Sequence, residues 1–137
     1  MSEWKILLVD DDPEDRAIIK DALDQMEAGD LVEFAGDGEQ ALSILDTGAH
    51  KGHKPTLIVL DLNMPRMNGT QTLLQLKNDD RFKEIPVVIY STSINPLEKE
   101  KCMGLGAHSY VTKPISFQES LDTARLFLRV SNNLHRA

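Results

Sequence analysis

Three short runs of the chain are almost wholly apolar, and they restrict the possible folds more than any other feature of the sequence. They read KILLV at 5–9, TLIVL at 56–60 and PVVIY at 86–90. A strand with one face in water alternates polar and apolar side chains, and these runs show no such alternation. They therefore predict strands buried on both faces, which is typical of a parallel sheet covered by helices.

Two further runs, LVEFA at 31–35 and HSYVT at 108–112, bring the number of expected strands to five. Amphipathic stretches with helix-starting signals separate the strands, and we expect helices to begin at Asp12-Pro13, Asp37-Gly38, Asn68-Gly69, Asn95-Pro96 and Ser116. The last of these signals has the form of a capping box closed by Glu119. Because parallel strands need crossover helices, this alternation predicts a doubly wound α/β domain with a five-stranded parallel sheet.

Size and charge exclude several classes of protein. The 137 residues, of which 41% are hydrophobic and 27% charged, fit one globular domain. No apolar run approaches the roughly 20 residues that span a bilayer, and the N-terminus lacks the pattern of a signal peptide, so we expect a cytoplasmic protein without membrane contact. A net charge of −7 argues against binding to a nucleic acid. The single cysteine, Cys102, agrees with a reducing compartment.

Polar side chains follow four of the five expected strands. In an open α/β sheet, ligands bind beyond the carboxyl ends of the strands, where the strand order reverses. The side chains expected at this edge are Asp10, Asp11, Asp61, Asn63, Ser91 and Lys113. The second strand ends at Ala35-Gly36 and adds no such group. The sequence therefore predicts a polar site built mainly from carboxylates.

The carboxylates of Asp10, Asp11 and Asp61 would repel one another at such a site unless positive charge offsets them. Lys113 offsets one unit of charge, and a divalent cation would offset two. Mg²⁺, or Mn²⁺ in its place, suits a site made of carboxylates, a backbone oxygen and waters. A phosphoryl group on Asp61 would leave a total charge of about −1 with the metal and about −3 without it. The residues therefore favour phosphoryl transfer to Asp61, with Ser91 able to donate a hydrogen bond to a phosphoryl oxygen.

Four segments together, LLVDDD, LIVLDLNMPRMNG, PVVIYSTS and GAHSYVTKP, resemble the receiver domain of the response regulators of two-component signalling. The resemblance covers about residues 4–130 and depends on the order and spacing of all four segments. It implies the flavodoxin-like (βα)5 receiver fold over 4–130. The short C-terminal tail at 131–137 leaves no room for a DNA-binding output domain, so we expect none.

The resemblance implies a role for each polar residue at the expected site. Asp61 matches the phosphoacceptor, Lys113 the base that pairs with the phosphoryl group, and Ser91 the switch hydroxyl. The matching metal ligands are Asp11 directly, Asp10 through water, Asp61, and Asn63 through its backbone carbonyl. Tyr110 matches the aromatic residue that turns inward on activation, and the family also implies a cis peptide bond between Lys113 and Pro114.

The function implied by the resemblance is that of a single-domain phosphorylation switch. A sensor histidine kinase would pass a phosphoryl group to Asp61. The changed surface would then bind a downstream protein, a histidine phosphotransfer protein, or a second copy of the chain through residues 95–130. Such a switch is not an enzyme, beyond promoting its own phosphorylation and slow dephosphorylation.

Two other functions compete with this hypothesis. The sequence does not separate a terminal regulator from a phosphorelay intermediate that passes the phosphoryl group on to a histidine phosphotransfer protein. An aspartyl-phosphate phosphatase is disfavoured, because Asn63 stands where such enzymes place a general-acid Asp, and no inserted cap is visible.

Two features depart from the commonest receiver pattern. Residues 47–55 form a long expected connection into the third strand, and Thr92 follows Ser91 where a small Ala is frequent. The connection and the STS triplet are similar to those of receivers that partner phytochrome-type sensor kinases. His50 and His53 have the spacing of a metal site, but without a third ligand we expect both to lie in a solvated loop.

Overall fold

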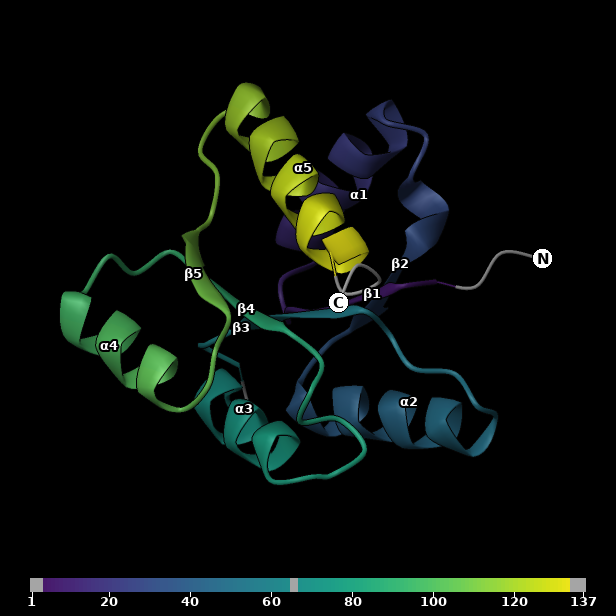
Figure 1. The fold of residues 1–137 in the computed structure, drawn as a ribbon. Helices are drawn as coiled ribbons and strands as arrows, with labels where there is room; N and C mark the ends of the chain where they lie inside the picture. The colour runs from purple at the N-terminus through teal and green to yellow at the C-terminus, as the bar shows by residue number, and fades with distance from the viewer. Residues whose placement is uncertain (1–3, 65–66, 134–137) are drawn as a thin grey trace.

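A single sheet of five parallel strands forms the centre of the computed structural model, which describes residues 4–64 and 67–133 (Figure 1). The strands are β1 (Ile6–Val9), β2 (Val32–Ala35), β3 (Leu57–Asp61), β4 (Val87–Ser91) and β5 (Ser109–Thr112). Their order across the sheet is β2-β1-β3-β4-β5. All five strands lie where the sequence predicts them, and this flavodoxin-like order confirms the predicted fold class.

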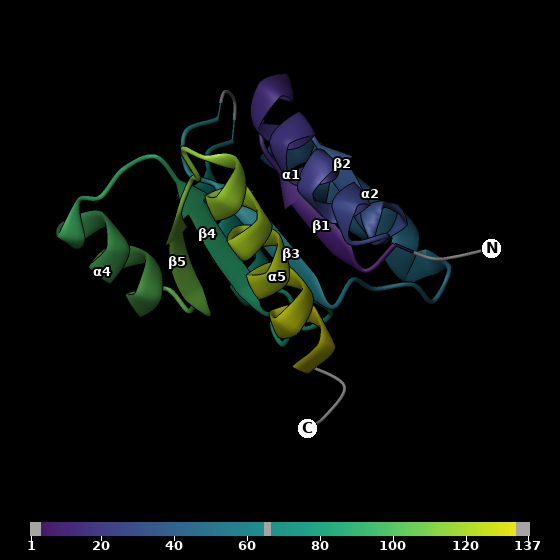
Figure 2. The same cartoon turned by 90° about the horizontal axis from the view of Figure 1, so that it is seen from above.

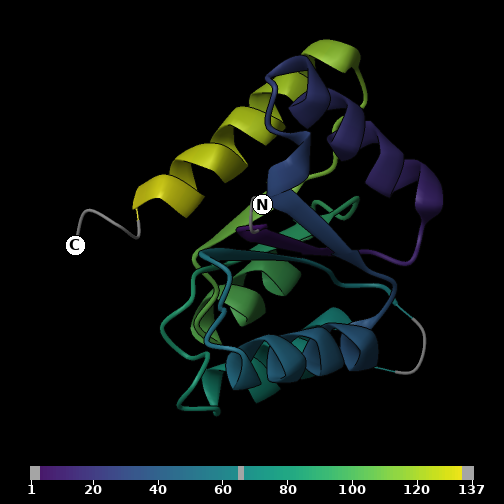
Figure 3. The same ribbon diagram turned by 90° about the vertical axis from the view of Figure 1, so that its right-hand side faces the viewer.

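Five α-helices of the described chain cover the sheet, and the first four of them connect successive strands. They are α1 (Pro13–Gln25), α2 (Gly38–His50), α3 (Gly69–Lys77), α4 (Pro96–Gly104) and α5 (Phe117–Asn133), and a short 3₁₀ helix, η1 (Gly29–Leu31), precedes β2. Helices α1 and α5 lie on one face of the sheet, while α2, α3 and α4 lie on the other (Figures 1 and 3). The sheet is therefore doubly wound, because the chain adds β2 on one side of β1 and then β3, β4 and β5 on the other side.

Alternate residues of the central strands supply two separate hydrophobic cores. Along β1, Leu7 and Val9 belong to the core under α2 and α3. Ile6 and Leu8 point the other way and belong to the core under α1 and α5. Every residue of β1, β3 and β4 is buried, which explains why these three runs lack polar alternation.

The capping box expected at the start of α5 is half formed. Ser116 Oγ accepts a hydrogen bond from the N–H of Glu119 at 3.1 Å, as predicted. The Glu119 carboxylate, however, accepts from the N–H of Ile115 and not from that of Ser116. A complete capping box, which the sequence analysis missed, joins Asn68 and Gln71 at the start of α3.

Helix α2 extends to His50, so the long connection expected at 47–55 is wrong over its first part. Ala49 packs against the hydrophobic core, and this contact favours the last helical turn. The chain turns away only at Gly52, whose φ of 76° is a conformation that glycine adopts easily. The connection into β3 is therefore shorter than the sequence predicts.

The two histidines of this region have different environments. His50 is exposed, as expected. His53 is half-buried, and its ring packs edge to face against Trp4 with the centroids 4.5 Å apart. The expected solvated environment is wrong for His53, because the chain before β3 lies against the start of β1, where the N–H of Thr56 donates to the carbonyl of Lys5.

Helix α5 continues to Asn133, past residue 130, where the receiver domain was expected to end. Its residues Ala124, Phe127 and Val130 are buried against the sheet beside α1. Within 4–64 and 67–133, no helix has both the length and the apolar character needed to cross a bilayer.

Candidate functional site

Polar residues predicted at the strand ends meet at the carboxyl edge of the sheet. The structure brings together Asp10, Asp61, Ser91 and Lys113, from the ends of β1, β3, β4 and β5. Parallel pairing sets Val9 opposite Leu60, so the next residues along these two strands are the two acids. The strand order reverses at this point, which is where open α/β sheets bind ligands.

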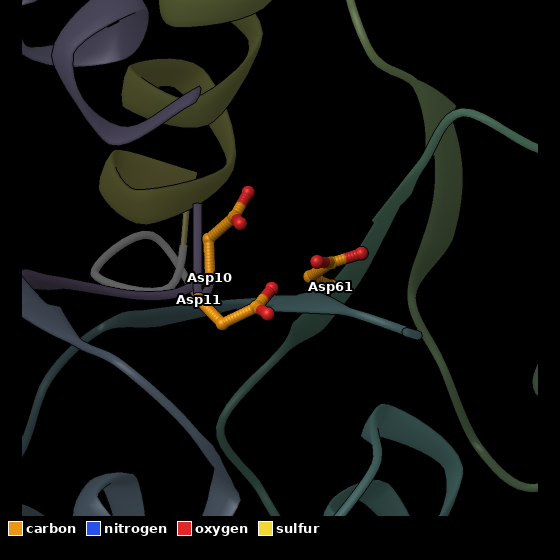
Figure 4. A group of neighbouring side chains, drawn as sticks. All are labelled: Asp10, Asp11 and Asp61. Atoms are coloured by element: carbon orange, nitrogen blue, oxygen red, sulfur yellow. The ribbon is translucent and has the colours of Figure 1, made fainter. Parts of the chain in front are cut away.

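The carboxylates of Asp10, Asp11 and Asp61 lie together at the ends of β1 and β3 (Figure 4). One oxygen of each lies within 4.8 Å of the others. Asp10 is fully buried and Asp61 is 5% exposed, whereas Asp11 is in contact with solvent. The site is therefore closed on the side of the sheet and open at Asp11.

The ammonium group of Lys113 lies among three carboxylates. Its Nζ is 2.7 Å from Asp15 Oδ2, 2.9 Å from Asp10 Oδ2 and 3.4 Å from Asp61 Oδ2. Asp15 is a site residue that the sequence analysis missed, because an acid in the first turn of a helix is already explained by the helix dipole. No signal along the chain distinguished it, since its contact with Lys113 depends on how α1 packs in the fold.

Burial and neighbouring charges raise the pKa values of Asp10, Asp61 and Lys113. Burial, reinforced by the charge of Asp10 and opposed by Lys113, raises the pKa of Asp61 from 3.8 to about 6. Burial also raises the pKa of Asp10, against the hydrogen bond that its carboxylate accepts from the N–H of Asp12 at 2.9 Å. Burial by itself would lower the pKa of Lys113, but the three nearby carboxylates outweigh it and hold that pKa above its usual value. The acids of the site therefore crowd around one ammonium group, with Asp10, Asp15 and Asp61 all within 3.4 Å of Lys113 Nζ.

A divalent cation fits this set of oxygens. Oxygens of Asp10, Asp11 and Asp61 lie within 4.8 Å of one another, and of the positive groups in the described chain the ion pairs place Lys113 Nζ beside them. A divalent cation would supply the further positive charge that three carboxylates need. Among the described residues, Asp61 Oδ1 has a long contact of 3.4 Å with the N–H of Asn63. Carboxylate oxygens are the ligands that Mg²⁺ and Mn²⁺ prefer.

Ser91 is connected to Tyr110 through a single residue, Ser93. Ser91 is fully buried, and its Oγ accepts a hydrogen bond from the N–H of Ser93 at 3.1 Å. The half-buried Tyr110 donates its hydroxyl hydrogen to the carbonyl of Ser93 at 3.0 Å. A movement of the Ser91 hydroxyl would therefore disturb the residue that holds Tyr110. Thr92, between the two serines, is exposed.

The glycine that ends the segment LIVLDLNMPRMNG is required by close packing behind Asp61. A Cβ atom at Gly69 would overlap the carbonyl oxygen of Asp61 and would approach Leu62 Cα to 2.8 Å. The N–H of Gly69 also donates to the carbonyl of Leu62 at 3.1 Å. The start of α3 can thus lie directly against the end of β3 only without a side chain at this position. Residues 65 and 66 of this segment lie outside the described part of the chain.

One expectation from the resemblance is wrong at the other side of the site. The peptide bond between Lys113 and Pro114 is trans, and the described residues contain no cis peptide bond. The trans form is the ordinary state of such a bond, favoured by about 0.5–1 kcal/mol. The N–H of Lys113 donates to the carbonyl of Ser91 at 2.8 Å, so β5 still delivers this residue to the site.

The sequence matches the family model described as the response regulator receiver domain over residues 6–125. The chain belongs to the response regulator receiver family. Receiver domains of this family act in two-component signalling as partners of sensor histidine kinases, and they are in general phosphoacceptor switches. The geometry at the carboxyl edge agrees with this membership.

Individual relatives match nearly all of this chain, but the match covers different shares of their own lengths. The transcriptional regulatory protein CpxR of Klebsiella pneumoniae subsp. pneumoniae (strain HS11286) is 37% identical over 128 residues, which are 93% of this chain but 50% of CpxR. The chain thus spans half the length of that regulator. The crystal structure of the phosphorylated cyanobacterial phytochrome response regulator RcpA is 32% identical with a TM-score of 0.81, covering 93% of this chain and 95% of RcpA. The Mn²⁺-bound form of the response regulator Rcp1 is 28% identical with a TM-score of 0.77, covering 90% of both chains.

Proposed function

We propose that Asp61 accepts a phosphoryl group from a sensor histidine kinase, and that the phosphorylated chain presents a changed surface to a protein partner. The observation that carries this proposal is the position of the Asp61 carboxylate. It lies with oxygens of Asp10 and Asp11 within 4.8 Å and with Lys113 Nζ at 3.4 Å. Phosphoryl transfer requires a protein mainly to place a nucleophile and to stabilise charge, and this set of groups is suited to both.

In the proposed transfer, a carboxylate oxygen of Asp61 attacks the phosphorus of a phosphohistidine. The O–P bond forms as the P–N bond breaks, and the leaving imidazole nitrogen takes up a proton from water. Asp61 is mostly ionised at pH 7, because its pKa of about 6 lies below that pH. Lys113 balances part of the negative charge on the phosphoryl oxygens.

A Mg²⁺ or Mn²⁺ ion is the proposed cofactor of this transfer. Its ligands would be Asp10, Asp11, Asp61 and the backbone carbonyl of Asn63. A cation held there would supply positive charge to the phosphoryl oxygens and reduce the repulsion between them and the carboxylates. Support comes from the oxygens of Asp10, Asp11 and Asp61, which lie within 4.8 Å of one another, and from the Mn²⁺-bound form of the similar regulator Rcp1.

The proposed output runs from Ser91 to the face formed by α4, β5 and α5, within residues 95–130. If the Ser91 hydroxyl turns toward a phosphoryl oxygen, its bond from the N–H of Ser93 is lost, and the contact of Tyr110 with Ser93 changes. Helix α4 lies at the β5 edge of the sheet (Figure 2) and exposes 74% of Leu97. A second copy of the chain or a downstream protein would bind this face. The same chemistry would serve a phosphorelay intermediate.

A phytochrome-type histidine kinase is the partner that we propose. The chain covers 95% of RcpA, described as a cyanobacterial phytochrome response regulator, at 32% identity.

The test is an intact-mass measurement after incubation with acetyl phosphate and Mg²⁺. We expect the wild type to gain the mass of one phosphoryl group, Asp61→Asn to gain none, and Asp11→Ala to gain less at equal Mg²⁺. The matched control is Asp12→Asn, which removes an exposed charge next to the site while keeping a side chain that can cap α1. Labelling of the Asp61→Asn protein would overturn the proposal.

A further inference from the structure

Asp15 makes the shortest contact of the Lys113 ammonium group. The Nζ···Oδ2 distance is 2.7 Å, and Lys113 donates a hydrogen bond across it. The distance from the same ammonium to Asp61 Oδ2 is 3.4 Å, beyond the usual range of an N–H···O hydrogen bond. In the unphosphorylated chain, the ammonium group expected to pair with the phosphoryl group is therefore held by Asp15 of α1 together with Asp10, whose Oδ2 is 2.9 Å away.

The first turn of α1 is fastened to the end of β1, so the position of Asp15 is well determined. Asp12 caps the helix by accepting a hydrogen bond from the N–H of Glu14 at 2.9 Å. Arg16 Nη1 donates to the backbone carbonyl of Asp10 at 2.7 Å. These two bonds hold α1 so that Asp15 faces the site rather than bulk water, and its side chain is 25% exposed.

Asp15 differs from the other acids at the start of α1 because it lies beside the nearly buried ammonium group of Lys113. Lys113 is 9% exposed, so its charge is poorly screened by water and interacts strongly with each carboxylate near it. Glu14, by contrast, is exposed on the same helical turn. A function in helix capping or in solubility would not require Asp15 to reach an ammonium 98 residues away along the chain.

We propose that Asp15 is a positioning residue that competes with the phosphoryl group on Asp61 for the ammonium of Lys113. Lys113 pairs fully with a phosphoryl oxygen only when its bond to Asp15 is lengthened or lost. Asp15 therefore weakens binding of the phosphoryl group. It also favours binding of a metal cation, because it adds negative charge to the site and keeps the Lys113 ammonium away from the metal ligands. This inference rests on the function proposed above.

Asp15→Asn should strengthen beryllofluoride binding and weaken Mg²⁺ binding. A loss of structure would weaken both. In Asp15→Asn, beryllofluoride, a mimic of the phosphoryl group, should bind on the order of tenfold more tightly in saturating Mg²⁺, the scale of one partly screened charge-assisted hydrogen bond. Mg²⁺ without beryllofluoride should bind a few-fold more weakly, because one negative charge is lost and the ammonium is free to approach. Amide chemical shifts of Ser91 and Asn63 would report both titrations.

Glu14→Gln is the matched control, since it removes the same charge from the same turn of α1 without touching Lys113. We expect it to leave both affinities unchanged. In a Lys113→Ala background, Asp15→Asn should no longer alter beryllofluoride binding, because the competition requires the ammonium.

The outcomes distinguish this inference from the proposed function. If the wild type binds no beryllofluoride, the proposed function fails, and the role of Asp15 fails with it. If the wild type binds it and Asp15→Asn binds it equally or more weakly, only the role of Asp15 is overturned. An equal gain in beryllofluoride affinity in Glu14→Gln would also overturn it, because the effect would then come from the net charge of α1 and not from the contact with Lys113.

Discussion

Replacing Asp61 with Asn should make the metal-free protein more stable at pH 8, and this gain should disappear in acid. Burial, together with the charge of Asp10, raises the pKa of Asp61 from 3.8 to about 6 in the folded chain. The folded state therefore holds this proton more tightly than the unfolded state does. Between these two pKa values the folded chain binds more protons, so stability falls as the pH rises through that window.

The shift of about two pKa units corresponds to about 3 kcal/mol, at about 1.4 kcal/mol per unit. Because Asp11 opens the site to water, which screens these charges, we expect a gain nearer to about 2 kcal/mol above pH 7. An Asn side chain keeps the shape of the carboxyl group without its charge, so packing around it should change little. The gain should be close to zero at pH 4, where Asp61 is protonated in the folded protein.

The assay is urea unfolding of wild type and Asp61→Asn at pH 4, 6 and 8 in the presence of EDTA. Asp12→Asn serves as the control for the loss of one negative charge, and its stability should follow that of the wild type. Addition of Mg²⁺ at pH 8 should narrow the difference, because an ion that binds only the folded wild type stabilises it. The reasoning is refuted if the difference is the same at pH 4 and pH 8, or if Asp61→Asn is the less stable protein at pH 8.

Two further predictions concern residues outside the carboxylate cluster. Trp4 lies about 20 Å from the acidic end of β1 by strand rise and packs against His53, so its fluorescence should not respond to Mg²⁺; strong quenching would show that the metal binds elsewhere. Tyr110→Phe removes the hydroxyl that contacts Ser93, so labelling of Asp61 by acetyl phosphate should match the wild type, while unfolding free energy should fall by about 1 kcal/mol. Size-exclusion chromatography with light scattering should show a smaller response of self-association to beryllofluoride in this variant, and labelling that falls in parallel would contradict the proposed order of events.

Much of the site could be predicted because a parallel sheet converts sequence order into position. The runs that form β1, β3 and β4 are buried on both faces, so their apolar character marks them without ambiguity. A polar residue placed directly after such a run must lie at the carboxyl edge, as Asp10 and Asp61 do. The N-cap at Asp12 was equally readable, because capping depends on a hydrogen bond two residues away.

Other features depended on contacts that no local signal contains. The end of α2 at His50 follows from packing of its last turn against the core, which overrides the loop-like composition of residues 47–55. His53 is half-buried because the chain before β3 lies against the start of β1. The expected cis bond before Pro114 was inherited from a family pattern and had no support in the residues themselves.

The sequence by itself determined the strands, the doubly wound order and the group of acids at one edge, since all of these follow from periodicity and from short-range hydrogen bonding. Only the tertiary structure decided which partner holds Lys113. Seen along the chain, Asp15 is one more acid in the first turn of a helix. The packing of α1 beside α5, just after the end of β1, brings its carboxylate to 2.7 Å from an ammonium 98 residues away, a contact set by which face of the helix meets the site.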